Sequence, residues 1–277
     1  MGPLVSTEWL DEHLHDPGLV VFDATKYLPN EGRDGAAEFA GAHIPGARFF
    51  DIDVVTDQDT KLPHMVPSAG RFERLMGEMG VGNGSTVVFY DQKGLASAAR
   101  GWWLMGLFGH DGAAVLDGGL PKWVREGRPV ANGTVDAPEP AVFRASLRAE
   151  RLRGIGDMMA ADRNRVVIDA RPAGRFAGSA PEPRPGLPSG HMPGSRSLPF
   201  NELLAADGTM LPKDALRARF ALAGIDGSLP VVTSCGTGVT ATILTLGLVQ
   251  AGLPQGAVYD GSWTEWAGRP DTTKERS

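Results

Sequence analysis

The chain has 277 residues, of which 42% are hydrophobic and 22% charged, and its formal net charge is −6. This composition excludes a disordered chain and is typical of a soluble globular protein with room for two domains. There is no basic block and no apolar run approaching the ~18 residues of a membrane span, so we expect neither nucleic acid nor a membrane as partner.

In chain order, the first long element predicted is a helix over residues 68–80. Ser68 suits its N-cap, the apolar residues that follow recur at helical spacing, and Gly80 suits its end. The second half repeats this pattern before Gly224. We expect the core to contain the apolar faces of both helices: Phe72, Leu75, Met76 and Met79 in the first, and Leu216, Phe220 and Ala223 in the second.

Five segments of the first half recur in the second half in the same order, which predicts a tandem duplication. Each copy alternates short apolar strands with helical segments, so we expect two α/β domains, each a mostly parallel sheet flanked by helices. The matched pairs are Phe22–Thr25 with Ile168–Arg171, His43–Gly46 with His191–Gly194, Met76–Val81 with Phe220–Ile225, Val87–Asp91 with Val231–Cys235, and Asp117–Trp123 with Asp260–Trp266.

The expected domain boundaries follow from a change in composition near the middle of the chain. We expect an N-terminal domain over 1–130, a C-terminal domain over 151–277, and a linker over 131–150, which contains Pro138 and Pro140 and has little periodicity. The polar tail from Gly268 is predicted to fray.

Cys235 is the only cysteine of the chain. An apolar strand is predicted before it and a helix after it, with a loop in which Gly236 and Gly238 flank Thr237. The N-terminus of a helix favours a thiolate and can bind an anion through its unpaired N–H groups. The alternative is a small buried hydrophobic residue. The two glycines favour the reactive thiolate, because packing alone does not need so open a loop.

A lone cysteine also excludes an internal disulfide and a multi-cysteine metal site, and we expect neither a metal nor a cofactor. It indicates a reducing, cytoplasmic compartment. At the position of Cys235 the first copy has Asp91. The first copy therefore lacks a nucleophile, and we expect it to act as a scaffold that contributes side chains to a cleft between the domains.

Four features together resemble the tandem-domain rhodanese family of sulfurtransferases, over essentially the whole chain. They are the segments 41–47 and 190–195, each with a His-x-Pro-Gly turn, the two Asp-Gly-x-x-x-x-Trp segments, and the loop Cys235–Thr240. The resemblance implies two rhodanese-like domains and a persulfide on Cys235, whose sulfur passes to a thiophilic acceptor. The uncharged loop is similar to that of the 3-mercaptopyruvate sulfurtransferase branch, whereas thiosulfate-specific members have two cations after the cysteine.

The resemblance also implies roles for further residues. Cys235, Thr237, Asp53 and His64 correspond to catalytic positions, and Thr237 stands where serine is usual. The residues implied in donor binding are Arg175, Arg184, Gly236, Gly238, Val239 and Thr240. An arginine fork suits a carboxylate and its neighbouring carbonyl. Simpler interpretations are a turn or helix cap for Asp53, a surface imidazole for His64, and solvated loop charges for the two arginines. His43 and His191 occur in both copies, so we expect them to be structural.

Three other functions are considered. Thiosulfate:cyanide sulfurtransferase activity stays open as the alternative. A cysteine phosphatase is disfavoured, because Ala241 stands where a Cys-x5-Arg loop has its arginine. A non-enzymatic binding module is disfavoured by the thiol, the hydroxyl and the two arginines of the second copy. With 3-mercaptopyruvate as donor, thioredoxin, cyanide and small thiols remain candidate acceptors, and the sequence does not fix the oligomeric state.

Overall fold

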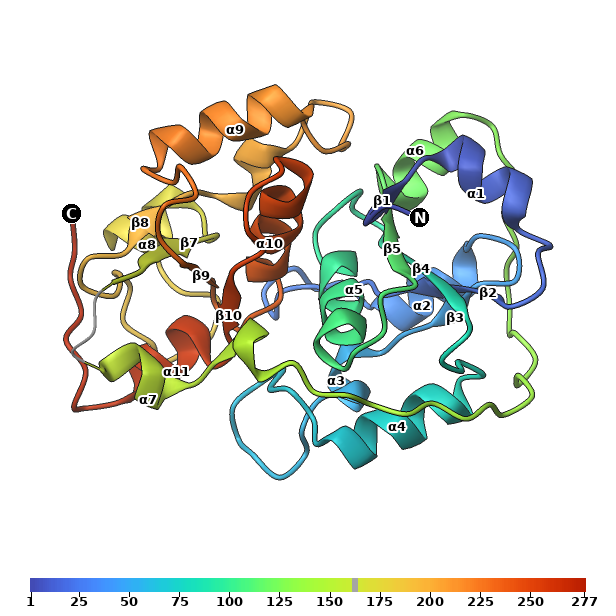
Figure 1. Cartoon of the computed structure of the whole chain (residues 1–277), viewed down its shortest axis with the longest axis horizontal. Helices are drawn as coiled ribbons and strands as arrows, with labels where there is room; N and C mark the ends of the chain where they lie inside the picture. The colour runs from blue at the N-terminus through green and yellow to red at the C-terminus, as the bar shows by residue number, and fades with distance from the viewer. Residues whose placement is uncertain (161–163) are drawn as a thin grey trace.

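The computed structural model describes residues 1–160 and 164–277. It contains two five-stranded sheets (Figure 1). The first sheet consists of β1 (Leu4–Val5), β2 (Leu19–Asp23), β3 (Arg48–Phe49), β4 (Thr86–Tyr90) and β5 (Ala113–Leu116). The second consists of β6 (Leu152–Arg153), β7 (Val166–Asp169), β8 (Arg196–Ser197), β9 (Val231–Ser234) and β10 (Ala257–Tyr259).

The two sheets have the same strand order, β1-β5-β4-β2-β3 in the first and β6-β10-β9-β7-β8 in the second. All the strand pairs within them are parallel. The predicted duplication and the predicted parallel α/β class are therefore confirmed. The central strands β4 and β9 are buried along almost their whole length, as expected of strands that helices cover on both faces.

Helices lie around both sheets. Those of the first domain are α1 (Thr7–His13), α2 (Gly35–Gly41), α3 (Ile52–Val55), α4 (Ala69–Glu78), α5 (Ala98–Leu107) and α6 (Gly119–Arg125). Those of the second are α7 (Ile155–Met159), α8 (Ala173–Ala177), α9 (Lys213–Leu222), α10 (Ala241–Gln250) and α11 (Ser262–Gly268), with 3₁₀ turns at Ala149–Arg151 and Phe200–Leu203.

The two predicted long helices are α4 and α9. Ser68 caps α4 by accepting a hydrogen bond from the backbone N–H of Arg71, and Gly80 follows the helix at φ +75°. The expected core faces are buried, except that Met79 and Ala223 at the helix ends are only half-buried. Both still pack against the main core.

The domains meet through α5 and α10, which lie side by side between the two sheets (Figure 1). All ten residues of α5 and most of α10 are buried. A helix that is apolar on every side must be covered on every side, and here each helix packs on its own sheet and on the other helix. One hydrophobic core therefore continues across both domains. This docking brings loops of the first domain against the carboxyl end of β9.

Residues 132–148, within the predicted linker, lie in no helix or strand and run along α4 (Figure 1). The N–H of Ala141 donates to the carbonyl of Gly77 (2.9 Å), and Phe143 packs edge-on against Phe72. The exact boundaries at 130 and 150 stay a prediction.

The predicted fraying of the tail is wrong. Glu275 pairs with His191 through two backbone hydrogen bonds, and Thr272 is buried. The polar composition misled because hydrogen bonds hold the tail: besides the backbone pairing, the hydroxyl of Thr272 donates to the carbonyl of Trp266, and the indole N–H of Trp266 donates to the carbonyl of Thr273 (2.8 Å).

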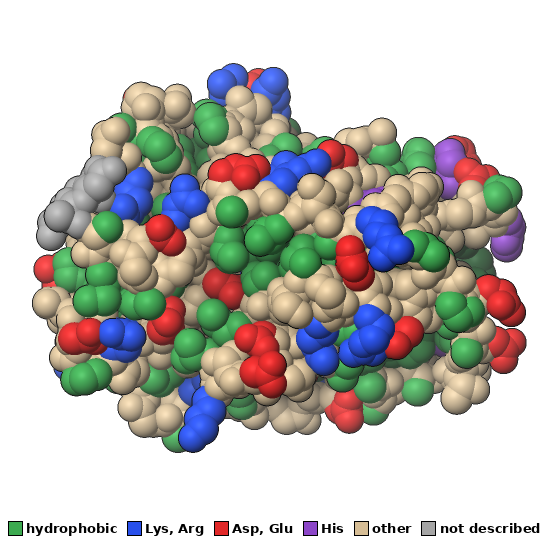
Figure 2. Space-filling view, turned by 60° about the horizontal axis from the view of Figure 1, so that its bottom comes forward, with side chains coloured by type: hydrophobic (Ala, Val, Ile, Leu, Met, Phe, Trp, Pro, Cys, Tyr) green, Lys and Arg blue, Asp and Glu red, His purple; other side chains and the backbone are tan. Residues whose placement is uncertain are grey.

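None of the helices in residues 1–160 and 164–277 is both long and apolar enough to span a membrane. On the face that Figure 2 presents, lysine and arginine side chains are interspersed with aspartate and glutamate, so no large basic patch forms there.

Candidate active site

Cys235 follows β9, the central strand of the second sheet, and its side chain is buried. The loop from Gly236 to Thr240 leads into α10, as predicted. Gly238 has φ +78°, and a Cβ there would lie 3.0 Å from the carbonyl oxygen of Asp260 and 3.2 Å from Nη1 of Arg100. Both the backbone conformation and the crowding therefore require glycine at this position.

The loop exposes its backbone N–H groups. Within the described residues, none of the N–H groups from Gly236 to Thr240 donates a hydrogen bond. The loop is held instead through its carbonyls: that of Cys235 accepts from the N–H of Trp263 (2.9 Å), and that of Gly236 accepts from the N–H (3.0 Å) and the hydroxyl (2.7 Å) of Thr264. This leaves a set of preorganised donors around the sulfur, which suits an anion.

The corresponding loop of the first domain is filled by its own carboxylate. Asp91 Oδ2 accepts from the N–H groups of Ala96 (2.8 Å), Ser97 (2.8 Å) and Ala98 (2.9 Å), and Oδ1 accepts from Lys93 N–H (2.9 Å). The same backbone cradle is thus occupied in one domain and open in the other. Asp91 acts as a built-in anion that closes the first copy to ligands.

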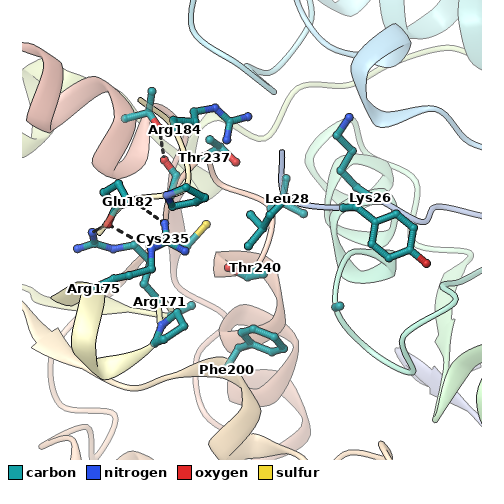
Figure 3. Close-up of a pocket in the computed structure, with 18 of the residues that line it drawn as sticks. Lys26, Leu28, Arg171, Arg175, Glu182, Arg184, Phe200, Cys235, Thr237 and Thr240 are labelled. Atoms are coloured by element: carbon teal, nitrogen blue, oxygen red, sulfur yellow. Dashed lines mark hydrogen bonds and ion pairs between the residues drawn. The ribbon is translucent and has the colours of Figure 1, made fainter. Parts of the chain in front are cut away.

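A cavity of about 120 Å³ opens at the Cys235 loop, between the two domains. It lies beside the carboxyl ends of β7 and β9, where the chain crosses from one side of the sheet to the other, and parallel α/β sheets bind ligands at such switch points. Figure 3 shows the Cys235 sulfur directed into this space, with Leu28 of the first domain on the opposite side. Eight of the ten predicted site residues line it: His64, Arg175, Arg184, Cys235, Gly236, Thr237, Val239 and Thr240.

The other two predicted residues lie just outside the cavity. Gly238 shapes the loop, as described above. Asp53 stands behind His64 and forms a relay with it: Asp53 Oδ1 is 3.0 Å from His64 Nε2, and His64 Nδ1 is 2.8 Å from the hydroxyl of Thr237. Lys26 forms an ion pair with the other oxygen of Asp53. The structure thus brings Asp53, His64 and Thr237 together from both domains.

The simpler interpretations of Asp53 and His64 do not fit. Asp51, not Asp53, caps α3, and the His64 side chain is only 6% exposed. The hydrogen bond from His64, followed by that from Lys26, holds the pKa of Asp53 well below its usual range. Burial lowers the pKa of His64. Near neutral pH, Asp53 is therefore ionised and His64 neutral, with its proton on Nε2 and the Nδ1 lone pair free to accept from Thr237.

The two predicted arginines differ in their partners. Arg175 donates to both oxygens of Glu182 (2.6 and 3.2 Å), and Arg171 donates to the same carboxylate (2.7 Å) and to Asp169. In Figure 3 Arg171 and Arg175 converge on Glu182. Arg184 has no hydrogen-bond or ion-pair partner among the described residues, and burial lowers its pKa.

Among the described residues, all but one of the cationic side chains that line the cavity are paired with a carboxylate. Arg171 and Arg175 are balanced by Asp169 and Glu182, Lys26 by Asp53, and Lys93 by Glu31. The guanidinium of Arg184 remains as the unbalanced cation among the described residues that line the cavity. In this largely buried site one guanidinium can pair one negative charge of a ligand, whereas the second charge of a dianion would be desolvated without a partner.

Sequence reasoning missed Lys26, Arg100 and Glu182. Glu182 lies between the two predicted arginines in a loop segment, where nothing in the sequence shows which charges pair. Arg100 gave a signal that was not used: it is the one charged residue in an otherwise apolar helix.

The two repeated histidines are structural, as predicted. Nδ1 of His43 lies 2.8 Å from the carbonyl oxygen of Phe39, and that of His191 lies 2.9 Å from the carbonyl oxygen of Phe176, with each ring stacked on that phenylalanine. In the part of the chain that the structure describes, no three His, Cys, Asp or Glu side chains are grouped to hold a metal.

Known proteins match this chain in family profile, in sequence and in structure. The sequence profile of the rhodanese-like domain matches residues 6–126 and 155–269, one match on each sheet. The chain is 42% identical to human 3-mercaptopyruvate sulfurtransferase, over 95% of this chain and 91% of that protein. It is 41% identical to the mitochondrial thiosulfate/3-mercaptopyruvate sulfurtransferase 1 of Arabidopsis thaliana, over 97% of this chain and 77% of that protein.

Among solved structures, the chain is similar to SseA of Escherichia coli, described as a 3-mercaptopyruvate sulfotransferase with a rhodanese fold. The TM-score is 0.85 at 36% identity, covering 95% of this chain and 99% of SseA. The tandem arrangement of two such domains is therefore shared along the length of the chain.

Proposed function

Because the chain belongs to the rhodanese family, we propose that it is a sulfurtransferase that takes the sulfur of 3-mercaptopyruvate onto Cys235 and passes it to a thiophilic acceptor, releasing pyruvate. The observation that carries this proposal is one cavity lined both by the Cys235 loop, whose N–H groups from Gly236 to Thr240 have no acceptor among the described residues, and by Arg184, the one unbalanced cation among the described lining residues. The same loop in the first domain is closed by Asp91.

The first chemical step forms one S–S bond and breaks one C–S bond. The Cys235 thiolate attacks the sulfur of the donor, and the electron pair of the C–S bond moves to carbon, which gives the enolate of pyruvate. The enolate then takes one proton to become pyruvate. The N–H groups of Gly236 to Thr240 can stabilise the persulfide anion that remains on Cys235.

The relay supplies the proton for this step. Neutral His64 can accept the proton of the donor's thiol through the hydroxyl of Thr237, and Asp53 stabilises the imidazolium that forms. The same path returns the proton to the enolate, so the net step consumes no external acid or base. Arg184 lines the cavity and can bind the carboxylate of the donor. Arg175 can contact the same carboxylate when its ion pair with Glu182 opens.

We infer a preference for 3-mercaptopyruvate over thiosulfate as donor, because Arg184 can pair the single carboxylate of 3-mercaptopyruvate but would leave one of the two charges of thiosulfate desolvated and unpaired. Discharge of the persulfide needs a second molecule, since Cys235 is the only cysteine of the chain. We propose a thiol such as that of thioredoxin, or cyanide, as acceptor, and a reducing compartment such as the cytoplasm, where an unpaired thiol persists.

The test is to incubate the protein with 3-mercaptopyruvate and to measure the mass of the intact chain and the pyruvate released. We expect a gain of one sulfur atom, with pyruvate released in a stoichiometric burst, and neither in Cys235→Ser. Arg184→Ala should raise KM for 3-mercaptopyruvate by about tenfold to hundredfold, the value of a hydrogen bond to a charged group. Release of pyruvate by Cys235→Ser, or a higher kcat/KM for thiosulfate, would overturn the proposal.

A further inference from the structure

Arg100 is fully buried where the two domains meet, although it carries a charge. Its Nη2 donates to the backbone carbonyl of His64 (2.6 Å) and to Asp260 Oδ1 (2.9 Å), and its Nη1 donates to the carbonyl of Gly238 (3.3 Å). The other oxygen of Asp260 accepts from the N–H of Val66 (2.7 Å). One guanidinium therefore joins the segment that carries His64 to the loop that carries Thr237.

Stability alone does not account for this arginine. A buried ion pair is on average no more stabilising than well-packed apolar residues of the same volume. In addition, Nε of Arg100 is buried without a hydrogen-bond partner among the described residues. An interface under selection only for stability has no need of such a group.

The duplication provides an internal comparison. Asp117, the counterpart of Asp260 in the first Asp-Gly-x-x-x-x-Trp segment, also crosses the interface, and its Oδ1 accepts from the N–H of Met210 (2.8 Å). Among the described residues no arginine contacts Asp117 in this mirrored arrangement: the third residue of α5 is Arg100, whereas the third residue of α10 is Ile243. Arg125 does donate to the carbonyl of Asp207 (3.3 Å), but this contact is exposed. The aspartate contact thus forms in both halves, and in the described part of the chain a buried arginine joins it only beside the Cys235 loop.

The backbone is left-handed at this point in both halves, but the residue that adopts it differs. Two residues before Met210 stands Gly208 at φ +84°, and two residues before Val66 stands His64 at φ +62°. Left-handed backbone is ordinary for glycine but uncommon for histidine, and it persists only where neighbouring groups hold it. The group that holds the carbonyl of His64 is Arg100.

From these observations we propose that Arg100 is a positioning residue for the proton relay. It fixes the backbone of His64 in the left-handed conformation and ties it to Gly238, so that the imidazole keeps its contact with the Thr237 hydroxyl across the domain interface. This inference rests on the proposed sulfurtransferase function. A displacement of about 1 Å in such a contact can lower the rate by about a hundredfold.

The first test is a double-mutant cycle between Arg100→Met and His64→Ala, with kcat and KM measured for 3-mercaptopyruvate. We expect Arg100→Met alone to lower kcat by about tenfold to hundredfold and to change KM by less than about threefold. In the His64→Ala background the same substitution should cost less than about threefold, because the relay is already broken. Equal losses in both backgrounds would overturn the proposal.

Asp117→Asn and Asp260→Asn form a matched pair of controls, since both remove one charge from equivalent interface contacts. Both should lower the thermal midpoint, but only Asp260→Asn should lower kcat, and it should do so non-additively with His64→Ala. If Arg100→Met does not fold, Arg100→Lys and Asp260→Asn carry the test, with the same non-additivity expected. An equal effect of the two asparagine variants on kcat would show a purely structural role.

A readout without any donor separates this inference from the proposed function. The ring nitrogen resonances of His64, followed by NMR against pH, report its tautomer and titration directly. We expect Arg100→Met to change both and Asp117→Asn to change neither. If Arg100→Met leaves the tautomer and titration of His64 unchanged, the inference is overturned even when the enzyme is active. If Arg100→Met changes them but the wild type transfers no sulfur, only the sulfurtransferase proposal is overturned.

Discussion

Replacing Thr237 by valine removes one hydroxyl and keeps the shape of the side chain. In the structure this hydroxyl is the partner of His64 Nδ1 at 2.8 Å, and both side chains are less than a tenth exposed. Valine therefore leaves a buried imidazole nitrogen without a hydrogen bond and interrupts the path of the proton. Thr237→Ser is the matched control, because it retains the hydroxyl and removes only the methyl group.

The magnitude follows from the geometry. A buried polar group that loses its partner costs about 1–3 kcal/mol, and a positioned general base contributes about 10²–10⁴-fold to a rate. Each 1.4 kcal/mol is about a factor of ten, so we expect kcat/KM for 3-mercaptopyruvate to fall by about a hundredfold in Thr237→Val. Thr237→Ser should stay within about fivefold of the wild type, since a lost methyl group costs ~1 kcal/mol or less.

The assay is single-turnover persulfide formation, followed by pyruvate release in rapid-mixing experiments. It isolates the step in which the relay acts and does not depend on the acceptor. Circular dichroism and thermal unfolding check that both variants are folded. If valine and serine impair the enzyme equally, or if Thr237→Val keeps more than about a third of the wild-type rate, the hydroxyl is not part of the proton path.

Three further results are expected. Glu182→Gln removes the carboxylate that pairs with Arg175 and so adds one net positive charge at the cavity. The ratio of kcat/KM for thiosulfate to kcat/KM for 3-mercaptopyruvate should therefore rise about tenfold. An unchanged ratio would exclude charge as the basis of donor choice. The relay needs neutral His64, and burial lowers its pKa from the ordinary 6.5, so activity should persist as the pH falls to 6.5 and be lost only below it; an acid limb of the pH–rate profile centred above 6.5 would contradict this. Asp91→Ala leaves three buried N–H groups without an acceptor and should lower the free energy of unfolding by about 3 kcal/mol in denaturant titrations, whereas Asp91→Asn, which keeps an acceptor, should lose less; equal losses would mean that the hydrogen bonds to Asp91 are not stabilising.

Local patterns in the sequence predicted much of the fold. The recurrence of Val87–Asp91 as Val231–Cys235 indicated equivalent central strands, and β4 and β9 do occupy equivalent places in the two sheets. Ser68 and Gly80 predicted the ends of α4 because caps act within one turn of the helix. The tail could not be predicted this way, since Glu275 is held by a backbone pairing to the distant His191.

The candidate site also has a part that the order of the residues predicts and a part that it does not. Cys235, its glycine loop and the following helix form one continuous segment, so their relation could be inferred from residue order alone. The resemblance supplied Asp53, His64, Arg175 and Arg184 as candidates but not their partners. Arg175 is bound by Glu182, while Arg184 has no partner among residues 1–160 and 164–277. This difference depends on how a proline-rich loop folds back, for which the sequence has no periodic signal.

By itself, then, the sequence determined a duplicated parallel α/β protein with a single cysteine before the amino end of a helix and an aspartate at the equivalent position of the first copy. Local hydrogen bonding and hydrophobic periodicity act between residues that are close in the chain, so they can be inferred from the sequence. Only the tertiary structure decided that His64 meets Thr237, that Arg100 ties the two domains at this point, and that Asp91 fills its own loop. The contacts of His64 and Arg100 join residues far apart in the chain, and the packing of α5 on α10 sets their geometry.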